Sequence, residues 1–269
     1  MAAQGGMAGD IFDQRRRALR FARAAGRHGY FTQQVAELLI ERVADVPRRF
    51  GRALLIGDGG GPLAAKLGAK VDRLDIWPPH SAINVQPESY DLLLWPLGLE
   101  GEGDVPDALL RARLALRPDG VLVGALFGDG SFAALRRAMQ AADAPHIVAR
   151  MHPQISLAAV GDLLHKIGLR LIVTDVERLT WAYRSLSALV ADLRDAALTN
   201  MLSGAVHPIG RAQWQRAEQA FMADATHGHD GVLRGRVDAR LLLFTAWAPH
   251  PDQPQEKRAL NTGIFDKLP

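Results

Sequence analysis

Two kinds of hydrophobic pattern alternate along the chain. Short continuous apolar runs, typical of strands buried on both faces, fall at 52–56, 71–76, 90–95, 121–127, 169–174 and 240–247, and the fifth run continues toward residue 183. Helices are expected at 11–28, 31–46, 62–68, 105–117, 131–142, 156–167, 185–199 and 211–224, and the second of them has apolar residues at helical spacing on one face. Because strands alternate with helices, the sequence predicts an α/β fold with a mostly parallel sheet and helices on both faces.

The connection between the second and third apolar runs is too short for this pattern. Only 14 residues separate Asp75 from Tyr90, and Pro78, Pro79 and Pro87 interrupt them. A crossover to a parallel strand needs a dozen or more residues besides the strand itself, and proline breaks regular structure. We therefore predict that the sheet lacks a full third strand and that the second strand lies at or near its edge.

The pattern divides the chain into four parts. Residues 1–50 form an N-terminal helical arm, residues 51–184 a Rossmann-like core, residues 185–230 a helical insertion, and residues 231–269 the last strand with a Pro-rich tail. The first helix has arginines but few large apolar residues, so we expect an exposed basic helix, either a solvated arm or a docking surface. Its arginines are Arg15, Arg16, Arg17, Arg20, Arg23 and Arg27.

Composition excludes several classes of site. The chain has no cysteine, which excludes disulfides, thiolate catalysis and cysteine-bound metals. A net charge of +3 is too small for a dedicated nucleic-acid binder, and no apolar run is long enough to span a bilayer. No signal peptide is visible, so we expect a cytoplasmic protein. We expect no metal site, because the His227-Gly228-His229-Asp230 run lies in a glycine-rich loop without further ligands at helical spacing.

A glycine-rich loop follows the first apolar run and leads directly into a helix. Its glycines are Gly57, Gly59, Gly60 and Gly61, with Asp58 between them and Pro62 at the first helical position. Glycine lets the backbone approach a ligand, and the helix that follows directs free N–H groups toward it. The spacing is that of the first loop of an S-adenosylmethionine-binding fold, or of a relic of one. We predict cofactor contacts at Gly57, Asp58, Gly59 and Gly61.

Several short motifs are shared with one known family. They are Ile11-Phe12-Asp13, Arg23-Ala24-Ala25, Leu116-Arg117-Pro118-Asp119-Gly120, Asp192-Leu193-Arg194 with Thr199-Asn200, and Ala246-Trp247-Ala248-Pro249-His250. With them the chain resembles the methyltransferase-like assembly factors of respiratory complex I and, more distantly, the biotin-pathway carboxyl methyltransferases. The resemblance implies a class I methyltransferase sheet with the last strand antiparallel, and S-adenosylmethionine as cofactor. It also implies an acceptor that is a protein, such as a respiratory complex subunit, or a small molecule, and it allows arginine modification. Asp75 matches the position that accepts the ribose hydroxyls.

Three departures from the family pattern affect the cofactor site. Leu55 stands where an acidic residue usually precedes the glycine loop, and the adenine-side acid falls in the shortened 76–89 stretch. The 97–104 stretch, rich in glycine and acid, replaces a His-Trp pair and is expected to be a flexible loop. Two functions therefore stay open: an S-adenosylmethionine-dependent enzyme with a weak cofactor site, or a degenerate, non-catalytic assembly or interaction protein.

Candidate substrate-pocket residues fall in and before the helical insertion. They are Tyr183, Asp192, Arg194 and Asn200, with Trp181 and Thr199 nearby. The alternative is that the charged residues lie on the surface, that Asn200 caps a helix and that the aromatic residues pack in the core. The sequence identifies no catalytic base, but methyl transfer depends more on in-line positioning than on a strong base.

Overall fold

The computed structural model describes residues 11–57, 61–205, 207–250 and 252. These residues form one seven-stranded sheet with strand order β2-β1-β3-β4-β7-β5, and β6 pairs with β7 outside this path. The strands are β1 (Phe50–Ile56), β2 (Val71–Trp77), β3 (Tyr90–Trp95), β4 (Leu116–Phe127), β5 (Arg170–Tyr183), β6 (Thr226–His227) and β7 (Leu233–Trp247).

The sheet confirms the predicted topology. Strands β2, β1, β3 and β4 run parallel, whereas β7 is antiparallel to both β4 and β5, as predicted for the last strand. Strand β2 lies at one edge, and residues 78–89 contain neither a helix nor a strand. The full third strand is therefore absent, in agreement with the proline-interrupted connection.

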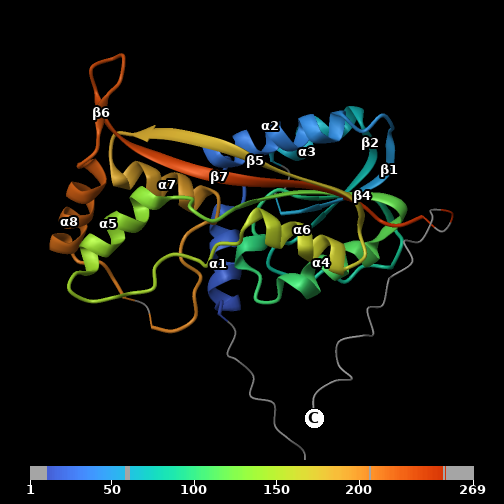
Figure 1. The fold of residues 1–269 in the computed structure, drawn as a ribbon, viewed down its shortest axis with the longest axis horizontal. Coiled ribbons are helices and arrows are strands. Elements are labelled where there is room, and N and C mark those ends of the chain that lie inside the picture. Colours follow the sequence, from blue (N-terminus) through green and yellow to red (C-terminus); the bar gives the residue numbers. More distant parts are fainter. Residues whose placement is uncertain (1–10, 58–60, 206, 251, 253–269) are drawn as a thin grey trace, which may run out of the picture.

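Helices cover both faces of the sheet, as Figure 1 shows, with α2 and α3 on one side and α4 and α6 on the other. Side-chain oxygens of Asp13, Asp104, Ser156 and Ser185 cap α1, α4, α6 and α7, and Pro62 stands in the first turn of α3. The helices are α1 (Gln14–Ala24), α2 (Tyr30–Ala44), α3 (Pro62–Lys66), α4 (Val105–Ala115), α5 (Ala133–Asp143), α6 (Leu157–Lys166), α7 (Leu186–Asp195) and α8 (Arg211–Met222), with 3₁₀ turns at Leu67–Ala69 and Leu99–Gly101.

The N-terminal helices belong to the packed body of the molecule. On α2, Phe31, Val35 and Leu39 are buried in the larger core cluster. Helix α1 carries Arg17, which is only 2% exposed. The prediction of a solvated basic helix is therefore wrong for Arg17. The spacing of residues along one helix does not show that another segment of the chain supplies hydrogen-bond acceptors to a buried guanidinium.

Strands β5 and β7 extend well beyond the rest of the sheet and carry the end of the molecule that holds α5, α7 and α8 (Figure 1). The helical insertion α7–α8 lies between them in sequence, as predicted. Strand β7 begins at Leu233 rather than near residue 240, and the short β6 was not predicted. The cause is a period-two pattern, in which buried Val237 and Ala239 alternate with exposed charged residues and so give no continuous apolar run.

The structure also corrects the predicted end of the helix that precedes β4. Helix α4 ends at Ala115, two residues before the predicted end, because Leu116 already pairs with Tyr90 of β3. The Arg117–Gly120 turn sequence therefore lies inside the range of β4, with Asp119 in the left-handed region at φ 62°.

Candidate functional site

A cavity of about 220 Å³ lies at the carboxyl ends of β1 and β3. Strand β1 has β2 on one side and β3 on the other. The connection from β1 to β2 and the connection from β2 to β3 therefore run in opposite directions across the sheet. Such a switch point is where open α/β sheets bind their ligands. Gly57 follows β1 directly and lines this cavity with φ +92°, a conformation that disfavours any side chain. We call it the cofactor cavity, because the sequence predicts a cofactor contact at Gly57, which lines it.

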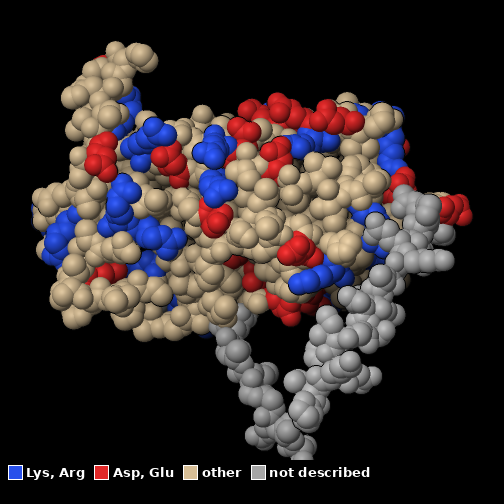
Figure 2. All heavy atoms as spheres, in the orientation of Figure 1, with Lys and Arg blue, Asp and Glu red and all other residues tan. Residues whose placement is uncertain are grey.

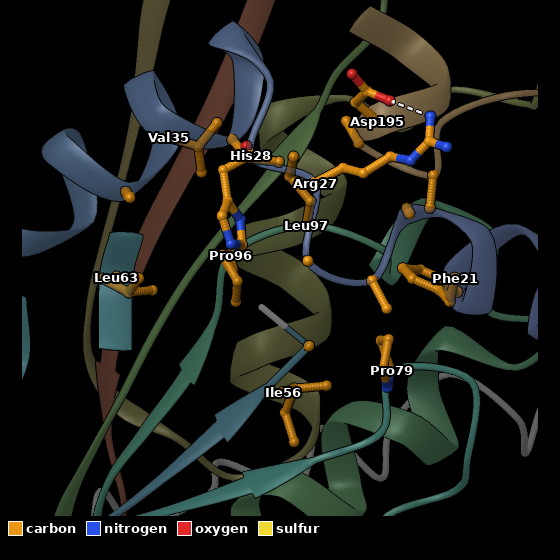
Figure 3. A pocket seen from close by; sticks show the side chains of 18 of the residues that line it. Phe21, Arg27, His28, Val35, Ile56, Leu63, Pro79, Pro96, Leu97 and Asp195 are labelled. Atoms are coloured by element: carbon orange, nitrogen blue, oxygen red, sulfur yellow. Dashed lines mark hydrogen bonds and ion pairs between the residues drawn. The ribbon is translucent and has the colours of Figure 1, made fainter. Parts of the chain in front are cut away.

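The walls of the cofactor cavity are mainly apolar. Figure 3 shows Ile56 and Leu97 from the sheet edge facing Phe21 of α1 and Val35 of α2, with Pro79 and Pro96 between them. One lining carboxylate, Asp195 at the end of α7, pairs with Arg27 at 3.2 Å. No other Asp or Glu stands among the described residues that line this cavity. A ligand would meet apolar surface over most of its length.

His80 is an unpaired polar group in the wall of the cofactor cavity. Its Nδ1 is buried and has no hydrogen-bond partner among the described residues, and its ring stacks with Phe21 at 6.4 Å between centroids. Burial, together with the charge of Arg17, lowers the pKa of His80. A neutral imidazole at this place has a nitrogen available for a ligand hydroxyl.

Arg17 fixes α1 over the cofactor cavity. Its guanidinium pairs with Glu102 at 2.5 Å and donates to the carbonyl oxygens of Gly98, at 3.3 Å, and Pro79. Residues 97–104 are thus not the expected flexible loop. Glu100, in the same segment, accepts the backbone N–H groups of Gly98 and Phe127 at 2.7 and 2.8 Å. Glu100 and Glu102, which were expected in a flexible loop, instead bond this segment to α1 and to the end of β4.

Asp75 lies away from the cofactor cavity. Strand β2 runs on to Trp77, and the Asp75 carboxylate accepts hydrogen bonds from Arg52 at 2.8 Å, Tyr90 at 3.1 Å and Arg73 at 3.1 Å. Burial opposes its ionisation, but these three hydrogen bonds outweigh burial and lower the pKa of Asp75. Its role as ribose acceptor stays a prediction, and its partners belong to the amino-terminal parts of β1, β2 and β3.

The glycine loop is described only at its two ends. Gly57 lines the cofactor cavity, and Gly61 is the N-cap of α3, where its carbonyl accepts the N–H of Ala65 at 3.2 Å. Asp58, Gly59 and Gly60 lie outside the described residues. Leu55, in place of the usual acid, is fully buried in the core.

The four predicted substrate-pocket residues separate into two pairs. Tyr183 donates to Asp192 at 2.7 Å, and burial, followed by this hydrogen bond, raises the pKa of Tyr183. Arg194 and Asn200 instead line a second cavity of about 240 Å³ on the other side of the α7 C-terminus. We call it the apolar cavity, because Phe132, Leu193 and other apolar side chains form most of its wall; Asp192 and Tyr183 do not reach it.

Glu100 and His152 also line the apolar cavity, and sequence reasoning missed both. Burial raises the pKa of Glu100 despite its two backbone hydrogen bonds. Burial lowers the pKa of His152 to about 4, so the ring is neutral and its Nε2 accepts the N–H of Met201 at 2.9 Å. Nothing in the local pattern shows that these two residues, distant in sequence, face one cavity.

Two candidate features take no part in either cavity. The Asp230 carboxylate of the His227–Asp230 run binds the Arg234 guanidinium through two contacts of 2.6 Å. Within the described part of the chain, no group of three His, Asp or Glu side chains is arranged to hold a metal ion. Nor is any helix there both long and apolar enough for a membrane crossing.

Comparison with known proteins finds relatives in sequence. No protein-family model matches the chain. Arginine-hydroxylase NDUFAF5, mitochondrial, from Danio rerio is 24% identical over 273 residues, which cover 90% of this chain and 83% of that protein. The chain is homologous to this protein and to others of the same name. The Mus musculus protein of the same name is 26% identical over 64% of this chain, a match that spans 57% of its own length.

A second group of relatives and the solved structures agree with this homology. A malonyl-[acyl-carrier protein] O-methyltransferase from Xylella fastidiosa (strain M23) is 32% identical over 60% of this chain, which spans about half (52%) of that enzyme. The YcgJ protein of Bacillus subtilis superposes with a TM-score of 0.52 at 12% identity, over 81% of this chain and 99% of the other. The fold is that of the Rossmann-like class I methyltransferases.

Proposed function

We propose that this protein is a cytoplasmic, methyltransferase-like assembly factor that holds S-adenosylmethionine weakly in the cofactor cavity and acts on a protein subunit of a respiratory complex. One observation carries the proposal. Gly57, left-handed and without a side chain, opens into a cavity at the switch point between β1 and β3. In open α/β sheets this is the place where the ligand binds.

The residues present fit part of the cofactor. Gly57 allows the backbone to approach the methionine portion, and Ile56, Pro79 and Leu97 offer apolar surface to the adenine ring. The unpaired Nδ1 of His80 is the available partner for a ribose hydroxyl. The bound cofactor would supply a methyl group on a sulfonium, and the protein's part is to align it with the acceptor.

The fit is incomplete at the ribose. The carboxylate in the wall, Asp195, is already paired with Arg27, and Asp75 is bonded to Arg52 instead of facing the cavity. A ribose hydroxyl buried without a partner costs about 1–3 kcal/mol of binding free energy. At about 220 Å³, the cavity also lies below the ~300–1,000 Å³ typical of ligand pockets. Weak binding follows from both features.

The same observations favour a second function, that of a non-catalytic assembly protein. In this alternative the cofactor cavity is a relic, and α1 is fixed over it by the Arg17–Glu102 pair. The protein would then act through its surface alone.

A complementation experiment separates these functions. The chromosomal gene is deleted in the source organism, and NADH:quinone oxidoreductase activity is measured in membranes after complementation with wild type, Gly57→Val or Gly231→Val. Gly231 also has a left-handed φ, +72°, and an added Cβ there meets open space, so it is the matched control for backbone strain.

We expect wild type and Gly231→Val to restore the activity and Gly57→Val to fail, because a side chain at residue 57 blocks backbone approach to the cofactor. Full restoration by Gly57→Val, with the variant folded, favours the non-catalytic alternative. Unchanged activity after deletion of the gene contradicts the assembly role altogether.

A further inference from the structure

A group of four arginines, two of them without a carboxylate partner among the described residues, lies next to the apolar cavity. A third cavity, of about 420 Å³, is lined by Arg16 and Arg20 of α1, Arg150 and Arg194. We call it the arginine cavity. It shares Arg194, Asn200 and Trp214 with the wall of the apolar cavity, so the two adjoin. The cofactor cavity lies on the other side of residues 195–197.

Two of these four arginines serve the fold. Arg150 holds the buried Asp143 through contacts of 2.6 and 2.7 Å, and Arg16 pairs with Asp13 at 3.4 Å and donates to the carbonyl oxygens of Leu202 and Gly204. They form fixed, charged walls.

Arg20 and Arg194 make no such structural contacts among the described residues. Within the residues that the structure describes, neither guanidinium has a hydrogen bond or an ion pair, and the Nε of Arg20 is buried. Burial, followed by the charges of neighbouring arginines on α1 and α7, lowers the pKa of Arg20. The acids of α7 are engaged elsewhere, Asp192 with Tyr183 and Asp195 with Arg27. Like charges that lie close together repel each other, and a bound anion would relieve that repulsion.

The apolar cavity adds a second, independent observation. Thr199 lines it, and the Thr199 hydroxyl is buried without a hydrogen-bond partner in the described structure. Apolar side chains such as Leu135, Met139 and Val190 form most of the wall, and the polar residues in it include Glu100 and His152. Figure 2 shows Lys and Arg side chains gathered over the same end of the molecule, where α5 and α8 lie. The positive charge of these side chains disfavours a cationic ligand.

We propose that the arginine cavity and the apolar cavity together bind one ligand with an anionic headgroup, a carboxylate or a phosphate, on an apolar body. Arg20 and Arg194 bind the headgroup, since guanidinium groups form charge-assisted hydrogen bonds with both acids. The apolar cavity holds the body, and the Thr199 hydroxyl meets a polar atom along it. This goes beyond the proposed function and does not depend on cofactor binding.

Calorimetric titration of the full chain, without cofactor, tests the site. The probes are decanoate and decyl phosphate, with decanol as the uncharged control and inorganic phosphate as the control without an apolar body. We expect both acids to bind, and both controls to bind about tenfold more weakly or worse. The tighter of the two acids identifies the headgroup. Decanol binding as tightly as either acid overturns the proposal.

Variants make the test specific to the two arginines. Arg20→Gln and Arg194→Gln each weaken acid binding about tenfold. Arg15→Gln, on an exposed residue of the same helix outside the cavity, leaves acid binding unchanged. Thermal unfolding separates binding from structure, because removal of an uncompensated charge leaves the midpoint unchanged or raises it. Wild-type affinity in both arginine variants overturns the proposal, whatever the outcome of the cofactor titration.

Discussion

The cofactor cavity and the arginine cavity share one helix and one turn but differ in charge: the carboxylate that lines the first is paired, and the described lining of the second holds four arginines and no acid. Helix α1 gives Phe21 to the first and Arg20 to the second, and the end of α7 lies between them. Acids near the cofactor cavity are neutralised by partners, as Asp195 is by Arg27, whereas Arg20 and Arg194 have none among the described residues. The comparison teaches that the cavity at the switch point of the sheet has its charges paired, while unpaired positive charge lies in the neighbouring cavity.

Breaking the anchor of α1 should disturb both cavities and have the largest effect. Arg17 is 2% exposed and its partner Glu102 18%, and removal of one member of a buried ion pair costs about 3–5 kcal/mol. We expect Arg17→Met to lower the free energy of unfolding by about 3 kcal/mol, the lower end because Glu102 keeps some solvent contact. Urea unfolding measures this, with the exposed Arg15→Met as control. A loss no larger than that of the control would show that α1 is held by other contacts.

Acidification should destabilise the folded protein through His152, which lines the apolar cavity. His152 has a pKa of about 4 in the folded protein against 6.5 unfolded, so between these pH values the unfolded chain binds more protons. The stabilisation is complete above pH 6.5 and is lost as the pH falls toward 4, by about 3 kcal/mol at most. His152→Gln, which keeps an acceptor for Met201, should remove this part of the pH dependence. Parallel stability curves for the two proteins would contradict it.

The sequence predicted the parallel half of the sheet better than the antiparallel half, for a physical reason. Strands buried on both faces, such as 90–95, are continuous apolar runs, and the structure has the same bounds. Strand β7 is half exposed near its start, where Arg236 and Asp238 alternate with buried residues, so its beginning was missed. The proline-interrupted 76–89 stretch predicted the missing strand correctly, because chain length limits any crossover.

The candidate sites were less predictable. Gly57 was predicted as a contact because a glycine-rich loop after a strand lets the backbone approach a ligand, and in the structure it lines the cofactor cavity. His80, Glu100 and His152 were not assigned to cavities, since their surroundings are set by segments distant in sequence. Asp75 has the family's position but points to Arg52, a partner that strand order alone does not reveal.

A side chain at Gly57 should affect the cofactor cavity alone. With φ at +92°, Gly57→Val strains the backbone by about 1–2 kcal/mol, and Gly231→Val, at +72°, should cost a similar amount. Only the first should abolish S-adenosylmethionine binding. Urea unfolding and calorimetry on the two variants measure this. Equal cofactor affinities in both would place the cofactor elsewhere.

Removing Arg27, the partner of Asp195, should have the smallest effect on stability and should change ligand binding in the cofactor cavity. Arg27 is 62% exposed, so Arg27→Gln should change the free energy of unfolding by less than about 1 kcal/mol. The freed Asp195 carboxylate can then accept a ribose hydroxyl, and we expect cofactor binding about fivefold tighter, the effect of one hydrogen bond of about 1 kcal/mol. Calorimetry checks this, and the double variant Arg27→Gln/Asp195→Asn should lose the gain. A gain that survives in the double variant would exclude Asp195 as its source.

Titration of the wild-type protein with S-adenosylmethionine and S-adenosylhomocysteine tests the central claim most directly. The cofactor cavity offers apolar walls and one unpaired imidazole nitrogen, with its carboxylate engaged by Arg27. We predict a dissociation constant on the order of 100 μM or weaker, equivalent to about −5.5 kcal/mol or less favourable. Low-micromolar binding of either compound would contradict the account of an incomplete cofactor site and favour an ordinary methyltransferase.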